Sequence, residues 1–424
     1  MPVAAFEGPA GTGKTHRLMD HMSGRLRAQP LAPHQRVLAL TFMHGARRRL
    51  DSRLREIEDL GGWYQAVTVD SFAWRLVQRW RRLAATLGYA IPQEERYDDT
   101  CALAAALMAR PAVKSWVAIS YPLILVDEAQ DLSNERSATI AEVATVAHVM
   151  LAFDEFQCLN PDLRPMPISA WLSGMCTPTS LTECRRTDDA ELLAAARAVR
   201  NGQAVNRNGR HFKVIVTPGP PNFAATCLAN FIAWRGSGQV AVLTPSRSGN
   251  FANNVVKLVC SQPLGKQQNG PFPILWERSD ESERRELWQR LALPDRCSVR
   301  DALAALEAHA AMPAIKSAAD WIARQKRVLG AEEITADHVR RHIDRTFATR
   351  RRHGAADRSQ FLAMTIQQAK NREFEHVVVI WPYTIPNDDE QKRRLLYNAI
   401  TRARRSCLVL VQGQQLLNAS PFVG

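Results

Sequence analysis

The chain contains eight cysteines, but no two of them have the C-x-x-C spacing that zinc sites and redox motifs use. Neither a structural zinc site nor a disulfide framework is therefore expected, and the thiols should be reduced. No apolar run approaches the roughly 18 residues that a membrane span requires, and the N-terminal residues do not have the pattern of a signal peptide. The sequence has no internal repeat and no low-complexity tract. These absences favour a globular cytoplasmic protein without a membrane partner.

The composition indicates two or more domains and a polyanionic partner. Hydrophobic residues make up 46% of the 424 residues, which is enough to fill more than one core. Lysine and arginine number 55 against 42 aspartate and glutamate residues, so the formal net charge is +13. A basic balance of this size favours a nucleic acid as partner. A generally arginine-rich amino-acid usage is the alternative that charge alone leaves open.

A phosphate-binding loop is predicted near the N-terminus, in the sequence EGPAGTGKTHRL. The pattern G-x-x-x-x-G-K-[ST] runs from Gly8 to Thr15, between a predicted strand, VAAF, and a predicted helix, RLMDHMSGRL. Backbone N–H groups of such a loop surround phosphates at a helix N-terminus, where the helix dipole also favours negative charge. The residues predicted to bind the nucleotide are Gly8, Pro9, Ala10, Gly11, Thr12, Gly13, Lys14 and Thr15, with the Thr15 hydroxyl also a ligand of Mg²⁺.

Two adjacent carboxylates, Asp127 and Glu128, end a predicted buried strand in the sequence LILVDEAQDLS. In a phosphate-loop ATPase one such acid holds Mg²⁺ and its neighbour polarises the attacking water. Asp127 is therefore predicted to be a metal ligand together with Thr15, and Glu128 is predicted to be catalytic. A DE pair by itself is more often an ordinary surface feature. The preceding strand and the phosphate loop give this pair its catalytic interpretation.

Predicted strands and helices alternate in both halves of the chain, which favours an α/β fold with two parallel sheets. The first domain is predicted to span 1–175, with a short helical insertion at about 73–118, and to end in a proline-rich stretch. The second is predicted to span 176–424, with a helical and charged insertion at about 262–355. Arginine-rich stretches of this insertion, such as RRELWQR, HVRRHIDR and TRRRHG, are compatible with contacts to duplex phosphates or with a solvated helix face.

The sequence DEAQD resembles the Asp-Glu-x-x-Asp box of superfamily 1 helicases of the UvrD/Rep type, and other segments resemble further motifs of that family in the correct order. The positions retained are Thr41, Phe42 and Ala46; Thr68, Ser71 and Phe72; Asp154 and Gln157; Arg186; Thr365, Lys370, Glu373 and Phe374; and Tyr397, Thr401 and Arg402. Three departures accompany these matches. Gln367 and Asn371 stand where the family has histidine and glycine, and no glutamine motif precedes the phosphate loop.

The resemblance implies two tandem RecA-like domains with parallel sheets and small helical insertions, which bind ATP and Mg²⁺ between them. It implies that Arg402 is an arginine finger and that Gln157 and Arg186 contact the γ-phosphate, so these three join Glu128 in the predicted catalytic set. Glu373 would bind the ribose. The predicted contacts to single-stranded DNA are Thr41, Phe42, Thr68, Phe72, Thr365 and Lys370. The two phenylalanines would stack on bases, with core packing as the alternative, and Lys370 would contact a phosphate or be a solvated charge.

The function that the resemblance implies is ATP-dependent translocation along single-stranded DNA, or helicase activity, with 3′-to-5′ polarity. One alternative is a DNA-stimulated ATPase subunit that licenses a partner nuclease in a bacterial defence or DNA repair complex. Another is a phosphate-loop ATPase unrelated to nucleic acid. No paired acids outside the ATP motifs indicate a nuclease within this chain. Because both insertions are short for the family, unwinding of long duplexes is expected to need a partner.

Overall fold

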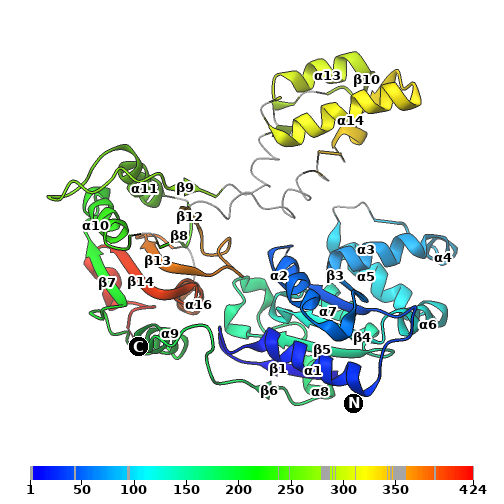
Figure 1. The fold of residues 1–424 in the computed structure, drawn as a ribbon, viewed down its shortest axis with the longest axis horizontal. Coiled ribbons are helices and arrows are strands. Elements are labelled where there is room, and N and C mark those ends of the chain that lie inside the picture. The colour runs from blue at the N-terminus through cyan, green and yellow to red at the C-terminus, as the bar shows by residue number, and fades with distance from the viewer. Residues whose placement is uncertain are drawn as a thin grey trace. The chain divides into compact units, whose positions relative to one another are not determined.

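The computed structural model describes residues 3–42, 44–92, 96–236, 238–247, 249–277, 287–288, 290–291, 293–310, 312–340, 342–343, 346, 360–385 and 388–423. The chain divides into two compact units (Figure 1). The larger unit comprises Met1–Ile274 and Gln360–Gly424, and the smaller unit comprises Leu275–Ser359. Two parallel sheets with helices on their faces form the larger unit. The prediction of an α/β fold with two tandem RecA-like domains is confirmed.

The first sheet has six parallel strands in the order β3-β2-β4-β5-β1-β6. They are β1 (Val3–Glu7), β2 (Val37–Thr41), β3 (Tyr64–Thr68), β4 (Leu123–Asp127), β5 (His148–Phe153) and β6 (Thr179–Ser180). The central strands β2 and β4 are buried along their whole length, because helices cover both faces of a parallel sheet. Thr41 pairs in register with both Thr68 and Asp127, so three strands end level with one another at the edge where the site lies.

Helices pack on both faces of the first sheet. The helical elements here are α1 (Lys14–Ala28), α2 (His44–Arg55), η1 (Glu58–Leu60), α3 (Val69–Arg79), α4 (Arg81–Thr86), α5 (Tyr97–Met108), α6 (Pro111–Ser120), η2 (Ala129–Asp131), α7 (Asn134–Val143), η3 (Glu155–Gln157), η4 (Pro161–Leu163) and α8 (Ser169–Met175). Leucines and methionines of α1 and α2 form the core on one face, and α3, α5, α6 and α7 form a larger core on the other. Among the described helices, none alone has the length and apolarity to cross a membrane; α5 and α6 meet that criterion only together, with a 98° bend between them.

The second sheet lies in the same unit, where its parallel strands follow the order β7-β14-β13-β8-β12. Its elements are α9 (Ala190–Arg200), β7 (Phe212–Thr217), α10 (Pro221–Ala233), β8 (Val240–Thr244), α11 (Phe251–Ser261), β12 (Phe361–Thr365), β13 (Phe374–Trp381), α16 (Asp389–Ile400), β14 (Ala403–Gln412) and η6 (Gln414–Asn418). The helices α9 and α16 pack on one face and complete its core. Along the sequence, the chain leaves this domain after α11 and returns at β12.

The smaller unit occupies that interruption. It contains β9 (Leu275–Trp276), β10 (Arg296–Ser298), α13 (Val299–Glu307), α14 (Pro313–Leu329) and β11 (Glu333–Thr335). The strands β10 and β11 pair antiparallel, and α13 and α14 bury a small core of alanine, valine, leucine and isoleucine. The predicted insertion at about 262–355 overlaps this unit largely, and its bounds stay a prediction. Several arginines of the arginine-rich stretches lie outside the described residues, namely Arg284, Arg285, Arg341, Arg345, Arg350, Arg351 and Arg352.

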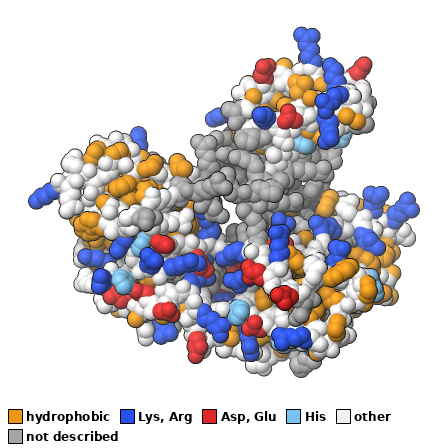
Figure 2. Space-filling model, in the orientation of Figure 1, with side chains coloured by type: hydrophobic (Ala, Val, Ile, Leu, Met, Phe, Trp, Pro, Cys, Tyr) orange, Lys and Arg blue, Asp and Glu red, His pale blue; other side chains and the backbone are white. Residues whose placement is uncertain are grey.

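The surface and the domain limits add three observations. Lysine and arginine side chains are scattered over the larger unit, among acidic ones, on the face that Figure 2 shows. All eight cysteines are free. The strand β6, at Thr179–Ser180, pairs with β1, so the first sheet extends past residue 175. The boundary between the two domains stays a prediction.

Candidate active site

The phosphate loop joins the end of β1 to the first turn of α1. Gly11 and Gly13 have φ angles of 82° and 79°, a left-handed region that residues with a Cβ rarely occupy. A Cβ on Gly11 would also stand 2.8 Å from Cβ of Arg186 and 2.8 Å from Sγ of Cys184. The glycines therefore permit both the turn itself and the close approach of the segment that carries Arg186.

The ammonium group of Lys14 lies within this loop. Its Nζ atom donates to the carbonyl oxygens of Gly8 and Pro9, at 2.8 and 2.9 Å. Burial lowers the pKa of Lys14, and the carboxylates around it, with Asp154 foremost, oppose the shift only in part. A polyphosphate bound in the loop would supply the missing negative charge. The loop is therefore suited to an anion.

Thr15 and Asp127 are paired at the foot of the loop. The hydroxyl of Thr15 donates to Oδ2 of Asp127 at 3.0 Å. A hydroxyl and a carboxylate at this separation match the hard oxygen ligands that Mg²⁺ prefers, so the two residues fit the ion they are predicted to hold. Within the described ranges, no group of three or more histidine, cysteine, aspartate and glutamate side chains forms another candidate metal site.

Glu128 follows β4 directly and has a φ of 61°, which is uncommon for a residue with a side chain. Its Oε2 atom accepts a hydrogen bond from Nε2 of Gln130 at 2.5 Å. Burial, reinforced by the charge of Glu128, raises the pKa of Asp127. Burial acts on Glu128 in the same direction, but the positive charges of Lys370 and Lys14 outweigh it and its pKa is lowered. Glu128 is thus held ionised, as a group that polarises water must be.

Arg402 faces the phosphate loop from the second domain, between α16 and β14. Its side chain is 1% exposed, and Nη2 lies 3.4 Å from Oε1 of Gln157, which belongs to η3 of the first domain. Burial, with the nearby charge of Arg186, lowers the pKa of Arg402 to about 9. The lowered pKa means that nearby carboxylates do not fully compensate the buried charge of Arg402. The negative charge of a bound phosphate would compensate it. Arg402, the predicted arginine finger, and Gln157, predicted to contact the γ-phosphate, therefore meet across the two domains.

Arg186 and Glu373 form an ion pair at the same place. The Nε atom of Arg186 lies 2.8 Å from Oε1 of Glu373, and its Nη1 atom donates to the carbonyl oxygen of Thr401 at 2.9 Å. The other carboxylate oxygen of Glu373 is 2.8 Å from Nη2 of Arg404. Two arginines thus hold the carboxylate that is predicted to bind the ribose. That role of Glu373 stays a prediction.

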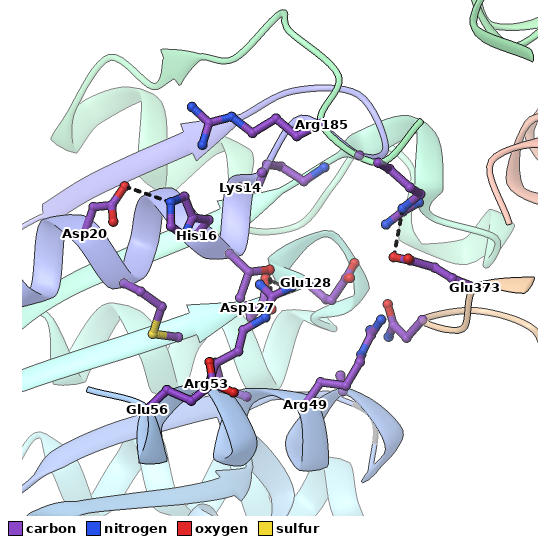
Figure 3. A pocket seen from close by; sticks show the side chains of 18 of the residues that line it. Lys14, His16, Asp20, Arg49, Arg53, Glu56, Asp127, Glu128, Arg185 and Glu373 are labelled. Carbon is purple, nitrogen blue, oxygen red and sulfur yellow. Dashed lines mark hydrogen bonds and ion pairs between the residues drawn. The ribbon is translucent and has the colours of Figure 1, made fainter. Parts of the chain in front are cut away.

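A single cavity of about 630 Å³ joins these side chains (Figure 3). The predicted residues on its wall are Gly11, Gly13, Lys14, Thr15, Asp127, Glu128, Gln157, Arg186, Glu373 and Arg402. The volume is within the usual range of ligand pockets. Pro9, Ala10 and Thr12 line a smaller hollow behind the loop instead. The loop therefore has two sides, one toward the cavity and one toward the second domain.

Four arginines line the cavity without having been predicted to do so: Arg49 and Arg53 of α2, Arg185 and Arg404. Arg49 lies in the run ARRRL, where several consecutive cations look alike and only the helix phase decides which one faces the loop. Arg185 precedes Arg186 and gave no separate signal. The excess of arginine around the loop suits a site for a polyanion.

Three of the residues predicted to contact DNA are buried inside the first domain. Thr41 is fully buried at the end of β2. Thr68 is 4% exposed and caps α3, accepting a hydrogen bond from the backbone N–H of Ser71 at 3.1 Å. Phe72 is 3% exposed and its ring packs edge-on against Tyr121 in the core. The side chains of these three residues serve packing and helix capping in this structure, and their direct contact with DNA stays a prediction.

The other three predicted contacts differ from one another. Lys370 is 7% exposed and its Nζ atom lies 2.6 Å from both carboxylate oxygens of Asp131, and its contact to a DNA phosphate stays a prediction. Phe42 is 37% exposed, with the guanidinium of Arg136 5.3 Å from its ring centre. Thr365 is half-buried, and its hydroxyl donates to Gln368 at 3.2 Å. DNA contact by Phe42 and Thr365 stays a prediction.

Comparison with known proteins places the chain in a family. The family described as AAA domain matches residues 2–213, half of the chain, and the one described as UvrD-like helicase C-terminal domain matches residues 360–410. No curated protein matches the chain.

Two solved structures are distantly similar. The crystal structure of the Arterivirus nonstructural protein 10 (helicase) is 12% identical to this chain and has a TM-score of 0.40. The match covers 99% of this chain and 62% of the viral helicase chain. The structure of that protein in complex with DNA is 12% identical to this chain and has a TM-score of 0.38. The match covers 98% of this chain and 63% of the helicase chain. This chain thus spans less than two thirds of their length, and likenesses this weak carry no argument about its activity. The AAA domain family covers half of the chain, so the chain belongs to that family, and the match of residues 360–410 to the UvrD-like helicase C-terminal domain identifies it as a UvrD/Rep-like helicase.

Proposed function

We propose that this helicase hydrolyses ATP between its two domains and uses the cycle to move along single-stranded DNA from 3′ to 5′. The observation that supports the proposal best is the position of Arg402. Its guanidinium comes from the second domain and lies 3.4 Å from Gln157 of the first, on the wall of the cavity that contains the phosphate loop. A cavity with catalytic groups from both domains changes whenever the domains move, which couples hydrolysis to motion.

Each group around the cavity has a defined task in this proposal. Lys14 and the loop N–H groups bind the phosphates, and Glu128 polarises the attacking water. Thr15 and Asp127 would hold Mg²⁺, which supplies charge neutralisation between the phosphates. Arg402 stabilises the negative charge that develops as the γ-phosphate leaves. None of these tasks requires a side chain from outside the larger unit.

Single-stranded DNA is the proposed track. Phe42 offers an exposed ring at the carboxyl edge of the first sheet, and an aromatic ring can stack on any base without reading sequence. The net charge of +13 favours a polyanionic partner, since phosphate contacts dominate the affinity of proteins that bind DNA without sequence preference.

Strand displacement tests direction and unwinding together. The parent chain and the Lys14→Ala variant are given duplexes that carry a 3′ or a 5′ single-stranded tail, at fixed salt and with excess ATP. The proposal predicts ATP-dependent opening of short 3′-tailed duplexes by the parent chain alone. Preferred opening of 5′-tailed duplexes would contradict the proposed polarity.

The length of the duplex tests the expected need for a partner. Each base-pair step costs about 1.4 kcal/mol in stacking, so unwinding requires a surface that meets the fork. The smaller unit comprises only Leu275–Ser359. We expect the purified chain to open short duplexes and to fail on long ones. Efficient single-turnover opening beyond about 50 base pairs would show that no partner is needed.

A further inference from the structure

Asp154, at the end of β5, is the centre of a buried group of polar side chains. Its side chain has no exposed surface, yet its carboxylate accepts four hydrogen bonds from side chains and the backbone nearby. Nη1 of Arg200 donates to Oδ1 at 2.8 Å, and Nε2 of Gln157 donates to Oδ2 at 2.8 Å. The backbone N–H of Phe156 donates to Oδ1 at 3.2 Å. Arg200 belongs to α9 of the second domain, so this carboxylate already joins both domains.

The hydroxyl of Tyr397, on α16, completes the group. Tyr397 is 2% exposed, and its hydroxyl donates to Oδ2 of Asp154 at 3.3 Å. The hydroxyl oxygen of Tyr397 also accepts two hydrogen bonds, from the backbone N–H of Ala10 at 2.7 Å and from Nη1 of Arg200 at 3.3 Å. One donated and two accepted hydrogen bonds use the full capacity of a phenol. Burial, reinforced by the charge of Asp154, raises the pKa of Tyr397, so its proton stays available for donation.

Ala10 makes this arrangement important for the nucleotide. It lies in the phosphate loop four residues before Lys14, on the side of the loop that faces the second domain rather than the cavity. The residue is 8% exposed, and a buried N–H group needs an acceptor. The hydroxyl of Tyr397, in the second domain, is that acceptor. It holds the phosphate loop on the side opposite the cavity.

The same group also reaches the catalytic side of the cavity. Asp154 orients Gln157, whose Oε1 atom lies 3.4 Å from Nη2 of Arg402. The backbone N–H of Asp154 donates to Oε1 of Gln130, which in turn donates through Nε2 to Glu128. Arg200 and Tyr397 are therefore one hydrogen bond away from Asp154, which is bonded to Gln157 directly and is linked to Arg402 through Gln157 and to Glu128 through Gln130.

We propose that Tyr397 and Arg200 are positioning residues of the ATPase: Tyr397 fixes the phosphate loop through Ala10, and Arg200 fixes Gln157 and Arg402 through Asp154. The inference rests on the proposed ATP hydrolysis and assigns two residues that neither bind nor transform the nucleotide. Because both come from the second domain, loop and arginine finger are in place together only when the domains are close. Separation of the domains would break the Tyr397–Ala10 and Arg200–Asp154 hydrogen bonds together, and so would release the phosphate loop and Arg402 at the same time.

The ring of Tyr397 has a separate, structural role that the test must keep intact. It packs edge-on against Phe156 at 5.2 Å, and the guanidinium of Arg200 lies 5.3 and 5.5 Å from the two ring centres. Tyr397→Phe keeps this packing and removes only the hydroxyl. Arg200→Lys keeps the charge, and Arg200→Gln removes it.

The experiment measures kcat and KM for ATP, nucleotide affinity with a fluorescent ATP analogue, and the melting temperature. Tyr397→Phe is expected to raise KM and weaken analogue binding about tenfold with kcat within about threefold, since a lost acceptor acts on ground-state binding. Arg200→Gln is expected to lower kcat about tenfold or more with KM within about threefold, and Arg200→Lys to recover part of kcat. Matched controls are Tyr383→Phe, at a tyrosine that is 40% exposed, and Arg197→Gln, one turn earlier on α9 and exposed.

A double-mutant cycle separates positioning from simple stabilisation. Arg200→Gln and Gln157→Ala should be non-additive in kcat, because both act on the same placement of Arg402. A lower melting temperature with unchanged kcat, KM and analogue affinity, or an additive cycle, would overturn the inference. If the parent chain hydrolyses no ATP, the proposed function itself fails. Analogue binding by Tyr397→Phe still decides the first half of the inference in that case.

Discussion

The Nζ atom of Lys370 lies 2.6 Å from both carboxylate oxygens of Asp131, and the two residues come from different domains. Lys370 follows β12 of the second domain, and Asp131 is the last acid of the DEAQD sequence in the first. Their side chains are 6% and 9% exposed. A buried ion pair leaves an uncompensated charge when one partner is removed, which is strongly destabilising. The pair therefore joins the two domains close to Glu128, the predicted catalytic acid.

Lys370→Ala is expected to lower the free energy of unfolding by about 3–5 kcal/mol, because Asp131 is left buried and unpaired. Lys392→Ala is the matched control: its partner Asp389 is 71% exposed, and ion pairs in contact with solvent contribute about 1 kcal/mol or less. Replacing both partners by apolar residues, Lys370→Met with Asp131→Leu, should recover most of the loss. Urea unfolding followed by circular dichroism measures all three variants. Equal losses for Lys370→Ala and Lys392→Ala would contradict this account.

Arg402→Ala is expected to lower kcat for ATP by on the order of a thousandfold while nucleotide affinity stays within several-fold, as for other arginine fingers. The reason is that Arg402 balances charge that appears only in the transition state. Arg405→Ala, at a side chain that is 70% exposed on β14, serves as control and should keep the parent rate. Steady-state kinetics with a parallel binding titration checks both. An effect confined to KM would assign Arg402 to ground-state binding.

Lys14→Ala and Glu128→Gln should fail in different ways. The first removes a ground-state contact to phosphate and should abolish most nucleotide binding. The second should bind ATP normally and stall hydrolysis, because an amide cannot polarise water as a carboxylate does. Glu155→Gln, at a carboxylate that is 56% exposed, controls for the loss of one acid. Isothermal titration and single-turnover hydrolysis distinguish the two failures. Near-parent turnover by Glu128→Gln would remove Glu128 from the catalytic set.

Phe42→Ala is expected to weaken binding of single-stranded DNA by about 5- to 150-fold, the value of one stacked base at 1–3 kcal/mol. ATP hydrolysis without DNA should be unchanged. Phe223→Ala, at a ring that is 48% exposed on α10 of the second domain, is the matched control. Fluorescence anisotropy with an oligothymidine, at one fixed salt concentration, measures both variants. Equal affinities for the parent chain and Phe42→Ala would show that this ring is not the stacking platform.

The nucleotide site could be predicted from the sequence because its signals are local. A glycine pattern between a strand and a helix, and two acids after a buried strand, each occupy fewer than a dozen consecutive residues. Asn371 shows that even a departure from the family pattern follows local rules. It stands where the family has glycine, and its φ is 67°, a left-handed conformation that asparagine tolerates better than most residues.

The surroundings of the residues predicted to contact DNA could not be predicted from the sequence, since burial depends on packing between segments far apart in the sequence. Lys370 looks like a free cation in the sequence, and its partner Asp131 is 239 residues away. Phe72 has the same helical periodicity whether it packs on Tyr121 or on a base. Arg200 belongs to no motif at all, and only the fold brings it to Asp154.

The central claim is that this site couples ATP hydrolysis to DNA, and one titration tests it most directly. Steady-state hydrolysis of ATP by the parent chain is measured against increasing single-stranded DNA, with Lys14→Ala as the control for contaminating activity. The account predicts that the rate rises several-fold, saturates with DNA, and is absent in Lys14→Ala. A measurable rate that does not change at any DNA concentration would contradict it.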